Sequence, residues 1–363
     1  MSVIVLSAGG TGGHLFPAQA LAGELIRRGK TIVVMTDSRG HNYAKAFPGA
    51  RIETIPSAAF VDRSIARRIA APFQIAAGVA LAFAKLLKLK PGAVVGFGGY
   101  PSLPVMLAAS FTDIPTAILE QNTVMGRVNR LVMNRMRMVA AAFPIARFAP
   151  HDADKIILTG NPVRPEVLAL EGASYDTPTA HGPLNVLVFG GSQGARAFSE
   201  LVPAAIKLLP EDMRSRLDIV QQCRAEDLEG VRKTYAGASV KAELAPFFSD
   251  LPKRIAWAHL VIGRSGAGTV SELAVIGRPA ILIPLPYAMD DHQRPNADVL
   301  VKAGGAWSVV QRDLTPEILA QMLIAAFAKP ENLVARAAAA RSVARPDATL
   351  RLADMVERLA EAA

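Results

Sequence analysis

Two stretches of the chain share one order of apolar and polar positions. Near the N-terminus, the apolar residues 3–8 predict a buried strand, residues 9–13 predict a glycine turn, and residues 14–28 place apolar side chains on one face of a helix. The same order returns at residues 185–189, which are followed by the glycine-rich loop 190–194 and a second helical pattern. Each stretch therefore predicts a strand, a glycine loop and a helix.

Further apolar runs alternate with helical patterns in both halves of the chain. They predict strands at residues 32–35, 93–96, 116–119, 138–141, 217–221, 260–262 and 280–283. Because strands that alternate with helices form parallel sheets, the sequence predicts an α/β protein with two Rossmann-like, doubly wound domains. Substrates of such domains bind at the carboxyl ends of the strands.

Turn-forming residues separate the two halves. Pro and Gly punctuate residues 158–165, and residues 170–183 are turn-rich and weakly apolar. We therefore predict a first domain at residues 1–161 and a second at residues 162–340, in keeping with a length of 363 residues. The Ala-rich helix at about residues 341–363 is expected to pack back on the first domain.

Composition narrows the class of protein. Apolar residues make up 51% of the chain and charged residues 20%, as in soluble α/β proteins. The single cysteine, Cys223, excludes an intrachain disulfide and fits a reducing compartment. The first ten residues lack the basic start and cleavage site of a signal peptide, so we expect a cytoplasmic protein. The formal net charge of +9 indicates an anionic partner, for which lipid, nucleic acid and phosphorylated substrates compete.

The segment at residues 63–90 combines apolar and basic side chains. Its most apolar part is interrupted by Pro72, Gln74 and Gly78 and is shorter than the roughly 20 residues that span a bilayer, so no transmembrane helix is predicted. Basic residues surround the apolar ones: Arg63, Arg67, Arg68, Lys85, Lys88 and Lys90. This composition predicts an interfacial anchor for an anionic membrane surface, and two ordinary core helices are the alternative.

Glycine loops carry the first candidate chemistry. Four of the five residues at 9–13 are glycines, so backbone N–H groups can approach a phosphate at the start of the next helix; a tight turn is the alternative. The dinucleotide fingerprint fails because Leu15 occupies its third glycine position, and there is no P-loop motif. A second glycine-rich loop at residues 96–102 indicates a large phosphorylated ligand.

Polar residues near these loops are candidate site residues. His14 begins the first helix, where the dipole favours a neutral imidazole, so it is a candidate general base, and a structural histidine is the alternative. Ser192 adds a hydroxyl to the second glycine loop, and Arg164 is placed to neutralise a diphosphate. Glu272 is either a ribose ligand or an ordinary acid near a helix start.

Acidic residues occur in two segments that resemble metal sites. Residues 290–296 concentrate hydrogen-bonding side chains suited to sugar recognition, and a metal site of Asp290, Asp291 and His292 is the alternative. Asp152 and Asp154 imitate a metal-binding Asp-x-Asp motif but follow no predicted strand. We therefore predict neither a metal nor another cofactor.

Seven motifs in register resemble one enzyme family over nearly the whole chain. In order, they are GGTGGH, GFGGYPS, EQN, GNPVR, GGSQGA, RSGAGTVSE and DHQRPN. Their shared order identifies the chain as a member of the peptidoglycan glycosyltransferases of family 28. The resemblance implies the GT-B fold, in which two Rossmann-like domains face a cleft.

The resemblance also implies an activity. The family transfers N-acetylglucosamine, with inversion, from UDP-N-acetylglucosamine to the C4 hydroxyl of undecaprenyl-diphosphate-linked N-acetylmuramoyl-pentapeptide, without a metal. It implies a peripheral protein at the cytoplasmic face of the bacterial inner membrane, with cell-wall synthesis and division proteins as candidate partners.

The same resemblance assigns roles to individual residues. Donor-binding positions are Thr11, Gly12, Gly13, Asn122, Arg164, Ser192, Phe248, Ala267, Gly268, Thr269, Glu272, Gln293 and Asn296. Positions for the acceptor diphosphate are Gly10, Gly13, Gly98, Gly99 and Tyr100. His14 is implied as the base, with Glu120 as the second candidate. Gly268 stands where the family has a larger residue, which leaves the shape of the nucleotide loop open.

Two other functions compete. A UDP-sugar 2-epimerase would use the same scaffold, because a fold does not determine a reaction. A nucleic-acid-binding protein would explain the basic charge. Aromatic residues are only 6% of the chain and no recognition motif occurs, so no nucleic-acid partner is predicted.

Overall fold

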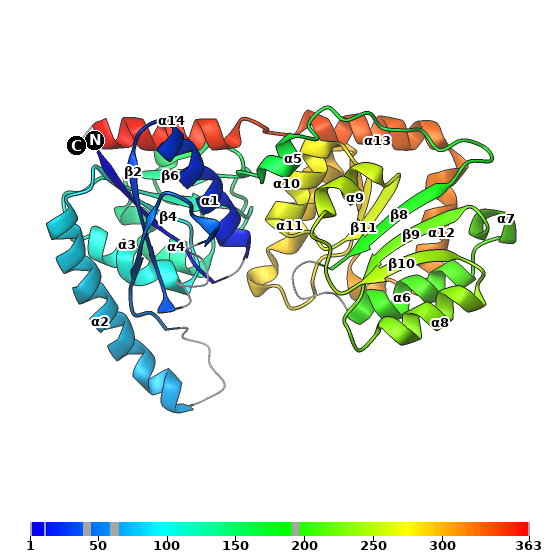
Figure 1. The fold of residues 1–363 in the computed structure, drawn as a ribbon, viewed down its shortest axis with the longest axis horizontal. Helices are drawn as coiled ribbons and strands as arrows, with labels where there is room; N and C mark the ends of the chain where they lie inside the picture. The colour runs from blue at the N-terminus through cyan, green and yellow to red at the C-terminus, as the bar shows by residue number, and fades with distance from the viewer. Residues whose placement is uncertain (1, 11, 39–44, 59–64, 191–195, 362–363) are drawn as a thin grey trace. The chain divides into compact units, whose positions relative to one another are not determined.

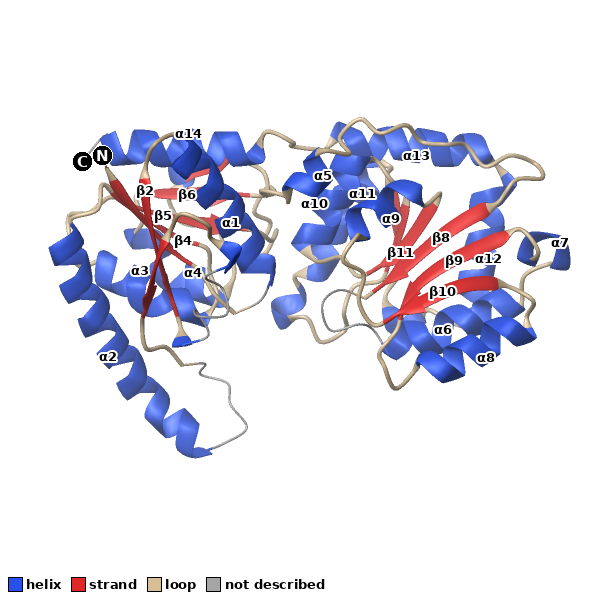
Figure 2. Ribbon diagram, in the orientation of Figure 1, coloured by secondary structure: helices blue, strands red, loops and turns tan. Residues whose placement is uncertain are grey.

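The computed structural model describes residues 2–10, 12–38, 45–58, 65–190 and 196–361, and the chain divides into two compact units (Figure 1). Unit 1 comprises Met1–Arg164 together with Pro346–Ala363, and unit 2 comprises Pro165–Arg345. The connection therefore lies between Arg164 and Pro165, close to the boundary at residue 161 that the sequence suggested. Each unit is an α/β layer structure with helices on both faces of its sheet (Figure 2).

Unit 1 contains a parallel sheet of seven strands in the order β3-β2-β1-β4-β5-β6-β7. The strands are β1 (Val3–Ser7), β2 (Thr31–Thr36), β3 (Arg51–Thr54), β4 (Ala93–Gly96), β5 (Thr116–Glu120), β6 (Met138–Ala141) and β7 (Ile156–Leu158). Its helices are α1 (Gly12–Arg27), α2 (Ile65–Leu89), α3 (Leu103–Ala109), α4 (Arg127–Val132) and α14 (Ala348–Glu361). In β1, Ile4 and Leu6 face one core and Val5 faces the other, as the period of a strand requires.

Unit 2 contains a parallel sheet of six strands in the order β10-β9-β8-β11-β12-β13. The strands are β8 (Leu184–Phe189), β9 (Leu217–Gln222), β10 (Lys241–Ala245), β11 (Leu260–Gly263), β12 (Ala280–Leu282) and β13 (Ala306–Ser308). Its helices are α5 (Pro165–Leu168), α6 (Arg196–Lys207), α7 (Glu211–Arg214), α8 (Leu228–Gly237), α9 (Leu251–Trp257), α10 (Ala267–Ile276), α11 (Gln293–Ala303), α12 (Pro316–Ala328) and α13 (Pro330–Ser342). The predicted fold class, two doubly wound parallel-sheet domains, is confirmed.

The last helix, α14, belongs to unit 1 although it follows unit 2 in the chain, and it lies beside α1 (Figure 1). Leu352, Val356 and Leu359 are fully buried in the core that α1 shares with the sheet. Arg28 adds ion pairs to Asp354 at 2.7 Å and Glu357 at 2.6 Å. The core of unit 1 is therefore completed by the C-terminal helix.

Helix α2 differs from its prediction. Pro72 and Gly78 lie inside one continuous helix of 25 residues, so the alternative of two core helices is wrong. By length and composition alone, its part Ala70–Leu89 could cross a membrane, with a mean hydropathy of 1.6 and 28% of it buried. Ile75, Ala82 and Leu86 are buried against α3 and the sheet. These contacts give α2 the role of a covering helix of unit 1.

Candidate active site

The carboxyl ends of β1, β4 and β5 are neighbours, because β4 pairs in parallel with both other strands. The loops that follow these strands carry the glycines at 9–10, the segment 97–102 and the EQN motif at 120–122. The sheet therefore brings three sequence motifs to one edge of unit 1, as expected for a substrate site.

His14 lies in the first turn of α1, against the loop that follows β4. A Cβ atom added at Gly99 would lie 3.3 Å from His14 Nδ1, and one added at Gly98 would lie 3.5 Å from His14 Cδ2. Both glycines have positive φ angles, 80° at Gly98 and 76° at Gly99, which residues with side chains rarely adopt. The loop thus presents bare backbone beside the imidazole, and three predicted site residues meet here.

The loop is anchored on its other sides. Gly99 precedes a short 3₁₀ helix (Tyr100–Ser102), and the Ser102 hydroxyl donates to the Gly99 carbonyl at 2.9 Å. A Cβ atom at Gly9 would lie 2.8 Å from Pro101 Cβ, so the first glycine loop packs closely on the second. Gly10 follows with a φ angle of 92°. Gly10, Gly98, Gly99 and Tyr100, four of the residues predicted for the acceptor diphosphate, therefore lie on two loops that pack against each other.

Glu120, the second candidate base, ends β5 and is only 1% exposed. Oε1 accepts hydrogen bonds from the Asn122 backbone N–H at 2.9 Å and from its side-chain amide at 3.2 Å. Oε2 accepts from the Gly126 N–H and from Asn129 Nδ2, both at 2.8 Å. Burial raises the pKa of Glu120, and these N–H donors act against that shift. Both oxygens of this carboxylate are engaged within the protein.

Three of the donor-site residues predicted in unit 1, Gly12, Gly13 and Arg164, lie around the start of α1. A Cβ atom at Gly12 would lie 3.0 Å from the Phe16 ring, and the Arg164 guanidinium lies 5.2 Å from the centre of the same ring. Gly12, Gly13 and Arg164 are therefore close together in space. Thr11 and Ser192 lie outside the described residues.

In unit 2, the residues predicted to hold the nucleotide begin α10 at the carboxyl end of β11. Ala267, Gly268 and Thr269 form its first turn, where backbone N–H groups are available to an anion, and Glu272 lies one turn further. A Cβ atom at Gly268 would meet nothing within 4 Å. The glycine is therefore not required by packing, and the loop accommodates the departure from the family pattern.

Gln293 and Asn296 lie in α11, whose start is tied to the loop before α10. Gln293 Oε1 accepts from the Leu285 N–H at 2.9 Å, and the Gln293 carbonyl accepts from the Ser265 hydroxyl at 2.7 Å. Asn296 is fully buried and donates to the Ser265 carbonyl at 3.3 Å. Asn296 thus joins α11 to the loop before α10, and Gln293 joins the start of α11 to that loop and to the backbone at Leu285.

Phe248 lies in the loop after β10 and is 7% exposed. The Arg254 guanidinium lies 4.2 Å from the centre of its ring. This cation–π contact holds the ring of Phe248, which the family resemblance assigns to donor binding.

Arg264 is a buried residue that the sequence argument did not single out. Its guanidinium donates to the Ile283 carbonyl at 3.0 Å and to Gln311 Oε1 at 2.7 Å, and it lies over the Phe198 ring. Burial lowers its pKa to about 10. Arg264 therefore fixes the loop after β12, and only its place at the end of β11 could have suggested this role.

The acidic segments are not arranged as metal sites. Asp290 and Asp291 both have positive φ angles, and Asp291 pairs with Arg294 at 3.2 Å. His292 Nδ1 lies 2.8 Å from the Met289 carbonyl oxygen. Among the described residues, no three His, Cys, Asp or Glu side chains are grouped to hold a metal ion. Asp152 caps a surface turn by accepting from the Asp154 N–H at 3.1 Å.

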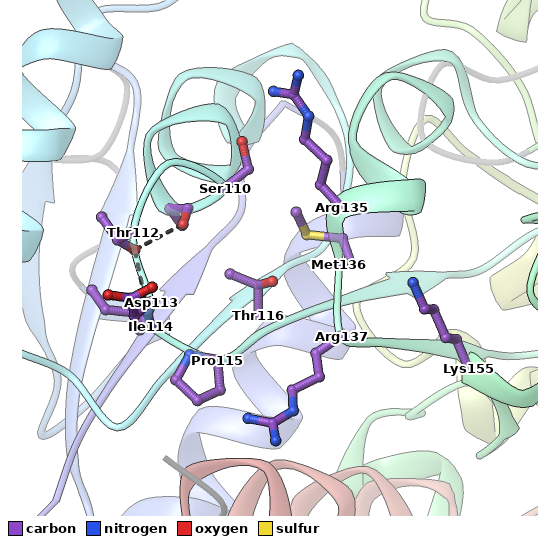
Figure 3. Close-up of a pocket in the computed structure, with 11 residues that line it drawn as sticks. Ser110, Thr112, Asp113, Ile114, Pro115, Thr116, Arg135, Met136, Arg137 and Lys155 are labelled. Atoms are coloured by element: carbon purple, nitrogen blue, oxygen red, sulfur yellow. Dashed lines mark hydrogen bonds between the residues drawn. The ribbon is translucent and has the colours of Figure 1, made fainter.

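A cavity of about 300 Å³ lies at the opposite edge of the first sheet, before the amino ends of β5, β6 and β7 (Figure 3). Ser110 and residues 112–115 line one side of it, and Arg135 and Arg137 line the other. The guanidinium groups of Arg135 and Arg137 point in opposite directions in this view. The described residues that line this cavity include none of the predicted site residues, so the cavity is separate from the candidate site.

Comparisons with known proteins agree with the motif order. Residues 4–141 match the glycosyltransferase family 28 N-terminal domain, and residues 185–358 match the glycosyltransferase family 28 C-terminal domain. A relative from Chelativorans sp. (strain BNC1), named UDP-N-acetylglucosamine--N-acetylmuramyl-(pentapeptide) pyrophosphoryl-undecaprenol N-acetylglucosamine transferase, is 51% identical over 357 residues. That alignment covers 98% of this chain and 95% of the relative.

Two solved structures resemble this chain over almost its whole length. The crystal structure of Acinetobacter baumannii MurG has a TM-score of 0.81 and 34% identity, and the match covers 98% of this chain and 99% of that chain. The UDP-GlcNAc 2-epimerase from Neisseria meningitidis has a TM-score of 0.67 with 14% identity, covering 99% of this chain and all of that one. The second likeness shows a shared fold alone.

Proposed function

The chain belongs to glycosyltransferase family 28, and on that premise we propose that it is the hexosyltransferase that moves N-acetylglucosamine from UDP-N-acetylglucosamine to undecaprenyl-diphosphate-linked N-acetylmuramoyl-pentapeptide. The 51% identity to a transferase of that name, over 98% of the chain, is the observation that carries this proposal. The acceptor group is the C4 hydroxyl of the muramoyl sugar, and the sugar is transferred with inversion.

A transfer assay tests the proposal. Radiolabelled UDP-N-acetylglucosamine is incubated with the protein and a synthetic lipid-linked muramoyl acceptor, with and without a chelator. We expect label in the lipid product in both cases, and loss of transfer with the chelator would instead show that the reaction requires a metal ion. A parallel incubation without acceptor should leave the donor sugar unchanged, whereas a 2-epimerase would convert it.

His14 is the base that we propose for a single in-line displacement. The acceptor hydroxyl loses its proton to the imidazole as its oxygen attacks the anomeric carbon, and UDP departs with the electrons of the broken bond. The place of His14 in the first turn of α1, beside the bare backbone of Gly98 and Gly99, supports this role. We expect His14→Ala to lower kcat by about 100- to 10,000-fold with little change in donor affinity. Near-normal turnover would assign the base elsewhere.

Glu272 is the residue that we propose as the ligand of the ribose hydroxyls. Its position one turn into α10 places it beside the N-terminal N–H groups that would bind the nucleotide. We expect Glu272→Gln to raise the KM for UDP-N-acetylglucosamine and to reduce discrimination against the 2′-deoxy donor. If the variant discriminated as strongly as the natural sequence, another residue would hold the ribose.

The membrane contact that we propose involves α2. Phe73, Leu81 and Leu87 are 75%, 40% and 52% exposed on this helix, and the exposed Lys88 follows Leu87. Lys85 pairs with Glu53, so its charge also serves the fold of unit 1. Exposed apolar side chains beside basic ones favour shallow insertion into an anionic interface. The predicted anchor also included Arg63, Arg67 and Arg68. Arg63 and the side chains of Arg67 and Arg68 lie outside the described part of the structure.

Vesicle sedimentation tests the contact. Phe73→Ser combined with Leu87→Ser should weaken binding to anionic vesicles, whereas transfer to a short-chain, detergent-soluble acceptor should continue. Unchanged vesicle binding would remove α2 from the membrane contact. A peripheral place at the cytoplasmic face of the inner membrane, near cell-wall synthesis and division proteins, is part of this proposal and is testable by fractionation and co-purification.

A further inference from the structure

The segment after β5 is folded around the carboxylate of Glu120. Four hydrogen-bond donors to this carboxylate, the N–H groups of Asn122 and Gly126 and the side-chain amides of Asn122 and Asn129, come from residues 122–129. Four N–H donors satisfy the ionised form of a carboxylate, which only accepts hydrogen bonds. The shape of this segment therefore depends on one buried charge.

Asn129 carries this arrangement to the neighbouring loop. It is 3% exposed in α4, and its Nδ2 donates to Glu120 Oε2 at 2.8 Å and to the Leu119 carbonyl at 3.3 Å. Its Oδ1 would lie 3.5 Å from a Cβ atom added at Gly98, as would His14 Cδ2. The Asn129 amide and the His14 ring therefore flank the same glycine, although no sequence motif singled out Asn129.

We propose that Glu120 is a positioning residue, and not the base, of the transfer reaction proposed above, and that it acts through Asn122 and Asn129. One end of the network holds Asn122, the predicted donor-site residue, and the other supports the backbone of Gly98 beside His14. Glu120 thus sets the distance between Asn122, which is predicted to bind the donor, and the backbone beside His14, which is predicted to bind the acceptor.

Accessibility separates this role from that of a base. A general base must come within hydrogen-bond reach of the proton that it removes. Each Glu120 oxygen already accepts two hydrogen bonds, and the residue is 1% exposed. Displacing a backbone N–H donor to admit a substrate hydroxyl would leave that donor buried without a partner.

Single substitutions test the network first. Glu120→Gln turns an amide N–H₂ toward existing N–H donors, and Asn129→Ala removes one donor, so each should misplace the loops and lower kcat/KM by about 100-fold. The pH profile of kcat should keep its ascending limb in both variants, because that limb belongs to the base. Asn134→Ala, at an exposed position of the neighbouring 3₁₀ helix (Met133–Arg135), is the matched control and should be neutral.

A double-mutant cycle tests the connection between the two residues. If Glu120 acts through Asn129, the double variant Glu120→Gln with Asn129→Ala should have a total loss in kcat/KM of little more than about 100-fold, close to that of either single variant. If the two residues act independently, their losses in kcat/KM should multiply to about 10,000-fold.

The outcomes separate the two proposals. Absence of transfer by the natural sequence would refute the proposed function itself. If that activity is present, either of two results would overturn the positioning role. One is that the losses of the two single variants multiply in the double variant, and the other is that Glu120→Gln loses the ascending limb of its pH profile. If Glu120→Gln does not fold, Asn129→Ala and Asn129→Asp carry the test, and wild-type kinetics in both would overturn it.

Discussion

Helix α2 passes so close to its neighbours at Gly78 that the position has no room for a side chain. A Cβ atom there would lie 2.0 Å from the Pro56 carbonyl oxygen and 3.1 Å from Pro104 Cβ. Contacts of this kind are favourable near 3.5 Å, so Gly78→Ala requires α2 or the backbone at residue 56 to move by more than about 1 Å. Overpacking costs about 1–3 kcal/mol, and the gain of about 1 kcal/mol from alanine in a helix offsets only part of it.

Gly23 in α1 is the matched control, because a Cβ atom there would meet nothing within 4 Å. We expect Gly78→Ala to lower the free energy of unfolding of unit 1 by up to about 2 kcal/mol and Gly23→Ala to raise it by about 0.5–1 kcal/mol. Urea titrations followed by far-UV circular dichroism would measure both. Equal stability of the two variants would refute the close packing of α2 on unit 1.

Three further predictions concern stability. Leu352→Ala, at a fully buried position of α14, should cost about 2–5 kcal/mol, whereas Leu350→Ala, 47% exposed on the same helix, should cost far less; equal costs in urea titrations would contradict the docking of α14. The hydrogen bonds and charges of Arg27 and Arg28 lower the pKa of Glu24 from 4.5 to about 2, so their stabilisation is present above pH 4.5 and is lost as the pH falls toward 2. Solvent screening reduces this to about 1 kcal/mol or less, and Glu24→Gln should remove that part of the acid dependence in unfolding measured between pH 6 and 2. Arg278→Met should cost about 3 kcal/mol, because the buried guanidinium donates to carbonyl oxygens that would lose their partner; a loss below about 1 kcal/mol in thermal unfolding would contradict this.

The strands missed at the sequence level share one property. β3, β7, β10 and β13 were not predicted, and they are the edge strands of the two sheets. Central strands such as β1 are buried on both faces and appear in the sequence as continuous apolar runs. Edge strands are partly exposed, so β3 and β10 carry Arg51, Glu53, Lys241 and Glu243 and lack that pattern. The apolar signal therefore predicts the centre of a parallel sheet better than its edges.

The candidate site was predictable where its residues lie in local motifs. His14 and the glycines at 98 and 99 occur in short glycine-rich segments that follow strands, so sequence spacing indicates their common edge. Asn129 and Arg264 act through partners brought together by tertiary packing, and their sequence neighbours give no sign of those contacts. The role of Glu120 is similar, because its burial and its four donors appear only in the folded chain.

The late position of α14 in the chain has a consequence for synthesis. Domains usually fold in the order in which they leave the ribosome. Here the apolar faces of α1 and the first sheet stay uncovered until Leu352, Val356 and Leu359 are synthesised, which happens only after all of unit 2. The nascent first unit is therefore exposed throughout translation of the second, and a ribosome that stops shortly before residue 348 would release a chain whose second unit is complete and whose first is not.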